Sequence, residues 1–199
     1  MSDPLPVVYL ARHGETAWSL SGQHTGRTDL ALTEHGEQQA RSLAEALRGL
    51  SFAAVLTSPS RRAVRTAELA GFGSLAEIVS DLAEWDYGRY EGRRTVEILG
   101  ERPGWQLFRD GCPGGESADQ VGARADRVIE RVRSAHADVV IFSSAHILRV
   151  FAARWLGLDA AAGRYFLLGT ASLSALGYEH NPAEPVIREW NAVHQVAAH

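Results

Sequence analysis

Short, mostly apolar runs recur along the chain, and most of them lead into residues with helical spacing. A continuous apolar run of this kind is typical of a strand that is buried on both faces of a parallel sheet. The segment Ser172–Tyr178 alternates small or polar residues with apolar ones, which is typical of a strand. The last predicted strand, Val186–Asn191, is expected at the sheet edge beside it. The predicted strands are Val7–Leu10, Ala53–Thr57, Ile78–Val79, Val139–Phe142, Ser172–Tyr178 and Val186–Asn191.

Capping residues and helical spacing predict helices between these strands. Thr33 is expected to cap a helix that buries Leu43 and Leu47 and ends at Gly49. Ser117 is expected to cap a long helix with apolar residues on one face. Further helices are expected after Ser60, at Thr95–Leu99 and up to Gly157. The alternation predicts an α/β fold, a three-layer sandwich with a mainly parallel central sheet and helices on both faces.

The composition narrows the class of protein. A chain of 199 residues, 45% of them hydrophobic, is expected to form a single domain over residues 1–199. The net charge of −4 gives no basic footprint for nucleic acid. Cys112 is the single cysteine, so neither a disulfide framework nor a cysteine-rich metal site is expected. We see no signal peptide and no apolar run of membrane-spanning length, and we expect a cytoplasmic protein with no membrane partner; assembly into a homo-oligomer stays open.

Cationic or polar residues follow three of the predicted strands. Arg12-His13-Gly14 follows the first strand, Ser58 to Arg62 the second, and Ser143 to Arg149 the Val139–Phe142 strand. Because the carboxyl ends of parallel strands share one edge of a sheet, Arg12, His13 and Arg62 are expected to meet around one small pocket. Arginine forks suit phosphate oxygens, and a neutral imidazole can attack phosphorus. Taken singly, each cluster also fits an ordinary solvated strand or helix end.

Two further segments are expected near this pocket. The polar loop Ser19–Leu32 either connects two elements or supplies hydroxyl and backbone donors to an anion. Glu84 and Asp86 stand among aromatic residues, where partial desolvation suits a general acid, or else they belong to a packed surface loop. In the first interpretation Glu84 protonates the departing alkoxide and then activates water. No cofactor and no metal ion is expected, since nothing in the sequence has metal-ligand spacing and the arginines neutralise the phosphate.

These pieces together resemble the histidine phosphatase superfamily, in its phosphoglycerate-mutase-like branch. The resemblance rests on Arg12 to Thr16, Thr25-Gly26, Ser58 to Ala63, Glu84 and the strip His146 to Arg149. It implies that His13 is the nucleophile, that Arg12 and Arg62 clamp the phosphate, and that Glu84 is the proton donor. It also places Ser19, Gln23, Thr25 and Gly26 at the substrate, with Ser19 where mutases usually carry an asparagine.

Three segments are most similar to the sugar-phosphate phosphatases that include sedoheptulose-1,7-bisphosphatases. They are Ser21–Gly26, Glu84–Gly88 and Trp105–Glu116. The resemblance therefore implies a metal-independent phosphatase that acts on small sugar phosphates through a phosphohistidine. Residues 85–117 are expected to form a cap over the site, and Arg102–Ser117 within it is interpreted as cap rather than core.

The chain departs from this family pattern after the Val139–Phe142 strand. The family has Ser-His-Gly there, and alignment through Leu148-Arg149 places its second catalytic histidine on Ser144 and its glycine on Ala145. Ser144 and Ala145 are therefore expected beside the phosphate, and His146, at a variable position, is not expected to replace the missing histidine. In the family, that second histidine donates a hydrogen bond to the transferring phosphoryl group. Losing one such donor costs about a hundred- to a thousandfold in rate. The alternatives to a weakened phosphatase are a phosphoglycerate mutase, disfavoured by the short segment after Glu84, and an impaired phosphosugar-binding pseudoenzyme.

Overall fold

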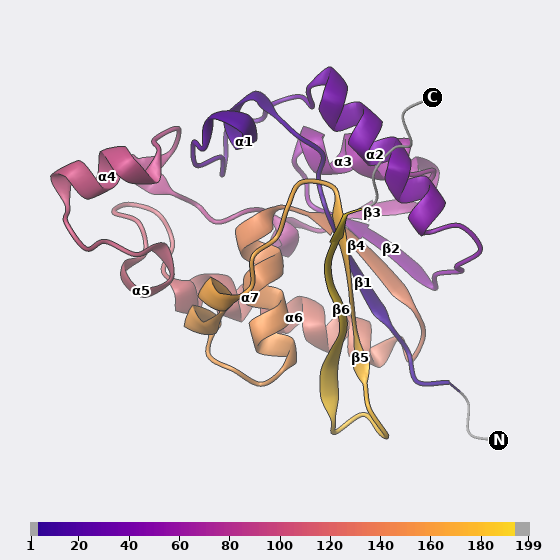
Figure 1. Ribbon diagram of the computed structural model, residues 1–199. Helices are drawn as coiled ribbons and strands as arrows, with labels where there is room; N and C mark the ends of the chain where they lie inside the picture. Colours follow the sequence, from indigo (N-terminus) through magenta and orange to yellow (C-terminus); the bar gives the residue numbers. More distant parts are fainter. Residues whose placement is uncertain (1–3, 194–199) are drawn as a thin grey trace.

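The computed structural model describes residues 4–193, and within them six strands form one sheet in the order β3-β2-β4-β1-β5-β6 (Figure 1). The first four strands in this order are parallel to one another, whereas β5 runs antiparallel to both β1 and β6. β6 lies at the edge beside β5, as the sequence predicts. The strands are β1 Val8–Arg12, β2 Ala54–Thr57, β3 Ala76–Ile78, β4 Val139–Ser143, β5 Ser172–Tyr178 and β6 Pro185–Val193.

The predicted helices are present, and short 3-10 turns join them. Thr33 accepts a hydrogen bond from the Gly36 amide and caps α2, and Ser117 caps α6 in the same way with Gln120. α2 ends at Ala46, earlier than the Gly49 that the sequence predicts. The helices are α1 Ala17–Ser21, α2 Glu34–Ala46, α3 Arg61–Leu69, α4 Thr95–Glu101, α5 Leu107–Asp110, α6 Ala118–Ser134 and α7 Ala145–Trp155.

Both faces of the sheet are covered by helices, because successive side chains of a strand point to opposite faces. On β4, Val139 and Ile141 pack in one core cluster with residues of α6 and α7. Val140 and Phe142 pack in a second cluster with residues of α2 and α3. Figure 1 shows the two helix pairs on opposite sides of the sheet. The predicted three-layer α/β sandwich is confirmed.

The segment between η2 (Ser80–Leu82) and α6 contains η3 (Gly88–Tyr90), α4 and α5, and Figure 1 shows α4 and α5 to one side of the sheet. Trp105, Leu107 and Phe108 are buried in the same core cluster as α6 and α7. The expectation that this segment lies outside the core is wrong for these residues. Aromatic side chains bury large apolar areas, which outweighs the turn-rich sequence around them.

No helix within residues 4–193 is both long and apolar enough to cross a membrane.

Candidate active site

The three strand ends lie together at one edge of the sheet. β1 pairs with β4 so that Arg12 is opposite Ser143, and β2 pairs with β4 so that Thr57 is opposite Phe142. The next residues, His13, Ser58 and Ser144, therefore leave the sheet side by side. All three are buried, and the His13 amide donates to the Ser143 carbonyl at 2.9 Å. The predicted convergence of the three strand ends is confirmed, whereas Arg62, predicted at the same small pocket, is not among the residues that line it.

His13 is held as a neutral imidazole in one orientation. Its Nδ1 lies 2.7 Å from the carbonyl oxygen of Gly14, which can only accept, so Nδ1 carries the proton and Nε2 is left with its lone pair. Burial lowers the pKa of His13 well below its ordinary value of 6.5, and the charges of Arg12 and Arg62 lower it further. A neutral ring with a free Nε2 is the form that a nucleophilic histidine requires.

His13 opens into a small pocket of about 70 Å³. Ligand pockets for whole small molecules measure roughly 300–1,000 Å³, so this one has room for a small group only. Of the residues that the sequence places at the site, it brings together Arg12, His13, Ser19, Gln23, Thr25, Glu84 and Ala145. His24, Tyr87 and His146 complete the lining.

Arg12 and Arg62 are placed differently around His13. Arg12 lines the pocket and donates through Nη1 to the Leu168 carbonyl. Arg62 is fully buried; its terminal nitrogens donate to the carbonyls of Thr25, Gly26 and Thr28. Burial lowers the pKa of both guanidinium groups, against the opposing charge of Glu84. Within residues 4–193 the Nε atoms of both arginines are buried without a partner, and an unpaired buried donor costs about 1–3 kcal/mol.

Glu84 is fixed by backbone amides rather than by the aromatic surface that its sequence neighbours indicate. Its Oε1 accepts from the Trp85 and Ile147 amides at 2.8 and 2.9 Å, and its Oε2 accepts from the His146 amide at 2.9 Å. His146 and Ile147 are the second and third residues of α7, so Glu84 satisfies amides that the helix leaves open at its start. This arrangement orients the carboxyl group in the pocket with His13.

Ser144 and Ala145 begin α7, but only Ala145 lines the small pocket. The hydroxyl of Ser144 lies 3.4 Å from Nη2 of Arg62, and the side chain is buried. Ser144 makes no capping bond to α7, whose first amides are taken by Glu84. The Ser144 hydroxyl oxygen therefore accepts from Arg62, and Ser144 is not among the residues that line the pocket of His13.

The loop after β1 is held by hydrogen bonds within the loop and by others to the segment around Glu91. Ser19 forms a capping box with Thr16, and the side-chain amide of Gln23 donates to the Gly92 carbonyl. The Gly26 amide donates to the carboxylate of Glu91 at 3.0 Å, and Gly26 faces a larger cavity instead of the small pocket. Ser19, Gln23 and Thr25 line the small pocket, whereas the Gly26 amide has a protein partner.

Gly14 is required by a close approach to a helix instead of by a ligand. A Cβ on Gly14 would lie 2.2 Å from the carbonyl oxygen of Gly36 in α2. The Gly14 amide donates to the hydroxyl of Thr66 in α3 at 3.1 Å, and that hydroxyl donates to the Arg62 carbonyl at 2.7 Å. Thr66 therefore connects the His13 loop to the Arg62 helix.

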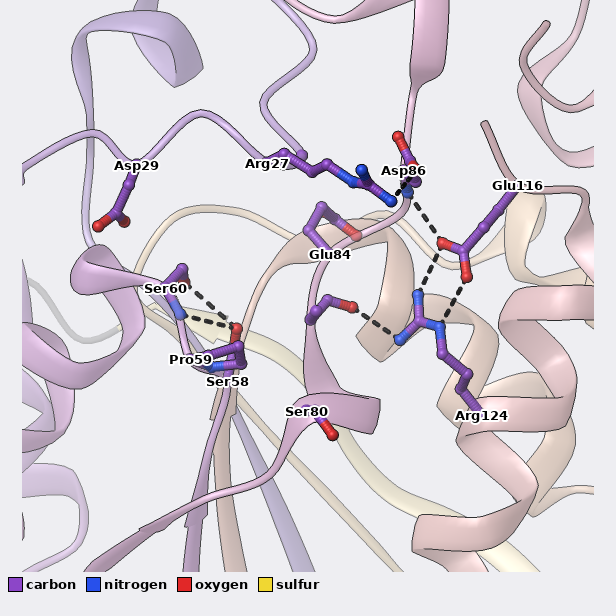
Figure 2. Close-up of a pocket in the computed structure, with 12 residues that line it drawn as sticks. Arg27, Asp29, Ser58, Pro59, Ser60, Ser80, Glu84, Asp86, Glu116 and Arg124 are labelled. Carbon is purple, nitrogen blue, oxygen red and sulfur yellow. Dashed lines mark hydrogen bonds and ion pairs between the residues drawn. The ribbon is translucent and has the colours of Figure 1, made fainter. Parts of the chain in front are cut away.

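A larger cavity of about 410 Å³ adjoins the other side of Glu84. Figure 2 shows Arg27 reaching Asp86 and Arg124 holding Glu116 across it. Ser58 and Ser60 supply hydroxyls, and Asp29 supplies a further carboxylate besides those of Glu84, Asp86 and Glu116. Asp86, the other general-acid candidate, faces this cavity and not the small pocket. Both arginines here are paired with carboxylates, and the wall also carries serine hydroxyls and the carboxylates of Asp29 and Glu84.

The side chains within residues 4–193 that come close enough to share a metal ion are Glu179, His180 and Glu184. They are exposed and lie in the turn between β5 and β6. Because β5 runs antiparallel to β1, the turn after β5 lies near the amino end of β1, whereas His13 follows its carboxyl end.

Sequence reasoning missed His24, Tyr87 and Thr66. His24 and Tyr87 stack with ring centroids 4.7 Å apart, and both line the small pocket. Their sequence neighbours carry no signal for this contact, because it joins the loop after β1 to the loop before α4. Thr66 stands one helical turn after Arg62, and that i to i+4 spacing is the signal that places the two side by side.

Known proteins are similar to this chain in both sequence and fold. Residues 8–193 match the model of the histidine phosphatase superfamily (branch 1). An acid phosphatase of Mycobacterium tuberculosis is 42% identical over 175 residues, 86% of each chain. Sedoheptulose 1,7-bisphosphatase of Saccharomyces cerevisiae is 37% identical over 187 residues, 77% of this chain and 68% of the yeast protein. Relatives that carry the name "Probable phosphoglycerate mutase GpmB" are 32% to 34% identical.

The solved structure of the Mycobacterium tuberculosis reading frame Rv3214 has a TM-score of 0.90 and 38% identity, over 96% of this chain and 99% of that one. The chain therefore belongs to the histidine phosphatase superfamily. Its class of enzyme is that of the phosphoric monoester hydrolases.

Proposed function

We propose that this protein hydrolyses sugar phosphate monoesters through a phosphohistidine on His13, without a metal ion. The observation that carries the proposal is the neutral His13 ring, whose Nδ1 is held by Gly14 while the side chain lines a pocket with Arg12 and Glu84. Two positive charges support an anion there, because Arg12 lines the pocket and the charges of both Arg12 and Arg62 act on His13. A phosphoryl group also matches the pocket of about 70 Å³.

The reaction runs in two displacements. The Nε2 lone pair of His13 attacks phosphorus, the N–P bond forms, and the ester P–O bond breaks. Glu84, as the carboxylic acid, gives its proton to the departing sugar oxygen. Glu84, now a carboxylate, then takes a proton from water, whose oxygen attacks phosphorus and breaks the N–P bond. Arg12 and Arg62 neutralise the charge on the phosphoryl oxygens throughout.

The larger cavity supports a sugar as the leaving group. Glu84 borders both spaces, so an alcohol that receives its proton lies next to that cavity. The carboxylates and serine hydroxyls of the wall suit sugar hydroxyls, since each can accept a hydrogen bond. Tyr87 lines the small pocket, and Asp86 and Glu116 line the larger cavity. All three belong to residues 85–117, which supports the prediction that this segment caps the site.

Rapid quench with a labelled sugar phosphate tests the proposal. We expect an acid-labile phosphoenzyme in the parent protein and none in His13→Ala. His35→Ala, at an exposed histidine of α2, is the matched control and should keep the phosphoenzyme. Phosphate release by His13→Ala at the parent rate would refute the proposal. Calorimetric binding of a sugar phosphate without turnover would favour the pseudoenzyme. Transfer of the phosphoryl group to 3-phosphoglycerate would favour the mutase.

A further inference from the structure

His146 lies in the small pocket with His13, although its sequence position belongs to no catalytic motif of the resemblance. Its side chain is 20% exposed and comes from the first turn of α7, two residues after Ser144. Arg12, His13 and Glu84 line the same space of about 70 Å³. Any phosphoryl group on His13 must therefore lie close to this imidazole.

The contacts of His146 decide which ring nitrogen carries its proton. Nδ1 lies 2.5 Å from the hydroxyl of Tyr87. Burial raises the pKa of Tyr87 well above 10.0, so Tyr87 keeps its hydroxyl proton. Burial also lowers the pKa of His146 well below 6.5, and the ring stays neutral. No other acceptor for the Tyr87 hydroxyl is found within residues 4–193, so the phenol donates to Nδ1 and Nε2 bears the hydrogen.

Nε2 of His146 is the free donor of this arrangement. Within residues 4–193 it has no hydrogen-bond partner, and it is not among the buried atoms left without one. The ring is positioned by Phe108 at a centroid distance of 5.5 Å, by Tyr87 at 5.9 Å and by His24 at 6.1 Å. Its backbone amide is fixed on Glu84. The donor is thus held in place before any ligand enters.

We propose that the Nε2–H of His146 donates to an oxygen of the transferring phosphoryl group, the role that Ser144 does not fill. Ser144 is turned toward Arg62 and does not line the pocket, whereas His146 does. This reverses the expectation that the sequence position alone gives. The inference rests on the proposed phosphohistidine function and identifies the donor that completes its pocket.

Two substitutions separate this role from a structural one. In His146→Asn the shorter amide reaches the place of Nδ1, keeps a partner for Tyr87, and removes the donor at Nε2. In His146→Gln the longer amide carries N–H to the place of Nε2. We expect His146→Asn to lower kcat about a hundredfold with little change in KM, because a lost transition-state donor costs this much. His146→Gln should stay within about tenfold of the parent. A side chain needed only to hold Tyr87 would give the reverse order.

The same substitution in a second background tests whether His146 replaces the family histidine. With Ser144→His and Ala145→Gly present, His146→Asn should cost less than about fivefold, since the restored histidine supplies the donor. An equal loss in both backgrounds, or no loss in the parent background, overturns the proposal.

Calorimetry with orthovanadate, an anion of phosphoryl shape, gives a readout that does not need turnover. The parent should bind it more tightly than His146→Asn, while His146→Gln should bind it nearly as well as the parent. A parent that forms no phosphoenzyme but shows this order refutes the proposed function and leaves the His146 contact standing. Equal binding by the parent and His146→Asn, or no binding by the parent, refutes the contact.

Discussion

Nη2 of Arg62 lies 3.4 Å from the hydroxyl oxygen of Ser144, so the residue in the position of the family's second histidine bonds to an arginine inside the protein. Ser144 is 1% exposed and does not border the pocket of His13. The pair explains why the shorter side chain does not simply stand in for the imidazole. Its consequences, and those of the contacts around it, can be measured.

Restoring the family residues should raise turnover where the donor of His146 has been removed. In the His146→Asn background we expect Ser144→His with Ala145→Gly to increase kcat at least about tenfold, a conservative discount on the value of one transition-state donor. In the parent background, where His146 supplies the donor, the same pair should change kcat by less than about tenfold. Phosphate release from a panel of sugar mono- and bisphosphates measures it. Ala145→Gly alone is the control, because it opens the pocket wall without adding a donor. Equal turnover of His146→Asn with and without the restored pair would remove Ser144 from this account.

Arg62 should not tolerate lysine. Its two terminal nitrogens donate to three carbonyls and to Ser144, and one ammonium group on a flexible stem cannot reproduce that fork. Arg62→Lys should lower the free energy of unfolding by about 1–3 kcal/mol and lower kcat about a hundredfold.

Arg65→Lys is the matched control for Arg62→Lys. Arg65 lies on the same helix, but it is half-exposed and pairs with Glu37 and Glu68 at the surface. Exposed ion pairs contribute little to stability. Urea titration and steady-state kinetics should leave Arg65→Lys near the parent, and similar losses in both variants would contradict the assignment of Arg62.

A methyl group at Gly14 should destabilise the protein. The added Cβ would lie 2.2 Å from the Gly36 carbonyl oxygen, so α2 or the His13 loop must move. We expect Gly14→Ala to lower the free energy of unfolding by about 1–3 kcal/mol. Gly100→Ala is the control: its Cβ meets nothing within 4 Å, and alanine in a helix should stabilise by about 0.5–1 kcal/mol. A stable Gly14→Ala protein with parent kcat would contradict this packing argument.

Stability should fall between pH 7.5 and pH 5.5. Burial lowers the pKa values of His13, His24 and His146 in the folded protein, so below about 6.5 the unfolded chain binds protons that the folded chain does not. The free energy of unfolding should then drop by up to ~1.4 kcal/mol per pH unit for each group. Urea titrations measure this slope. His24→Asn should reduce it, and a flat or rising free energy of unfolding toward pH 5.5 would contradict the burial of neutral imidazoles.

Local pattern was sufficient for most of the architecture. The apolar runs that became β1, β2 and β4 are continuous because these strands are covered on both faces, and Thr33 and Ser117 begin helices because their hydroxyls accept from open amides. The parallel order also follows from the alternation of strands and helices, and with it the meeting of His13, Ser58 and Ser144 at one edge.

The segment 85–117 was harder to interpret, since its turns and polar residues resemble a surface loop. Trp105 and Phe108 are buried in the core because distant helices supply the apolar surface that covers them. Which side chains a loop buries depends on what packs against it, and no local pattern in the segment contains that information.

By itself, the sequence determined the α/β sandwich, the superfamily and several of the residues that line the small pocket, because periodicity, caps and strand-end motifs are local. Only the tertiary structure decided what each of them contacts. It fixed the proton of His13 on Nδ1 through Gly14, gave Glu84 the amides of α7, and turned Ser144 toward Arg62. It also brought His146 into the pocket against Tyr87. Hydrogen bonds act over about 3 Å, and residues far apart in the chain come within that distance only when the fold is complete.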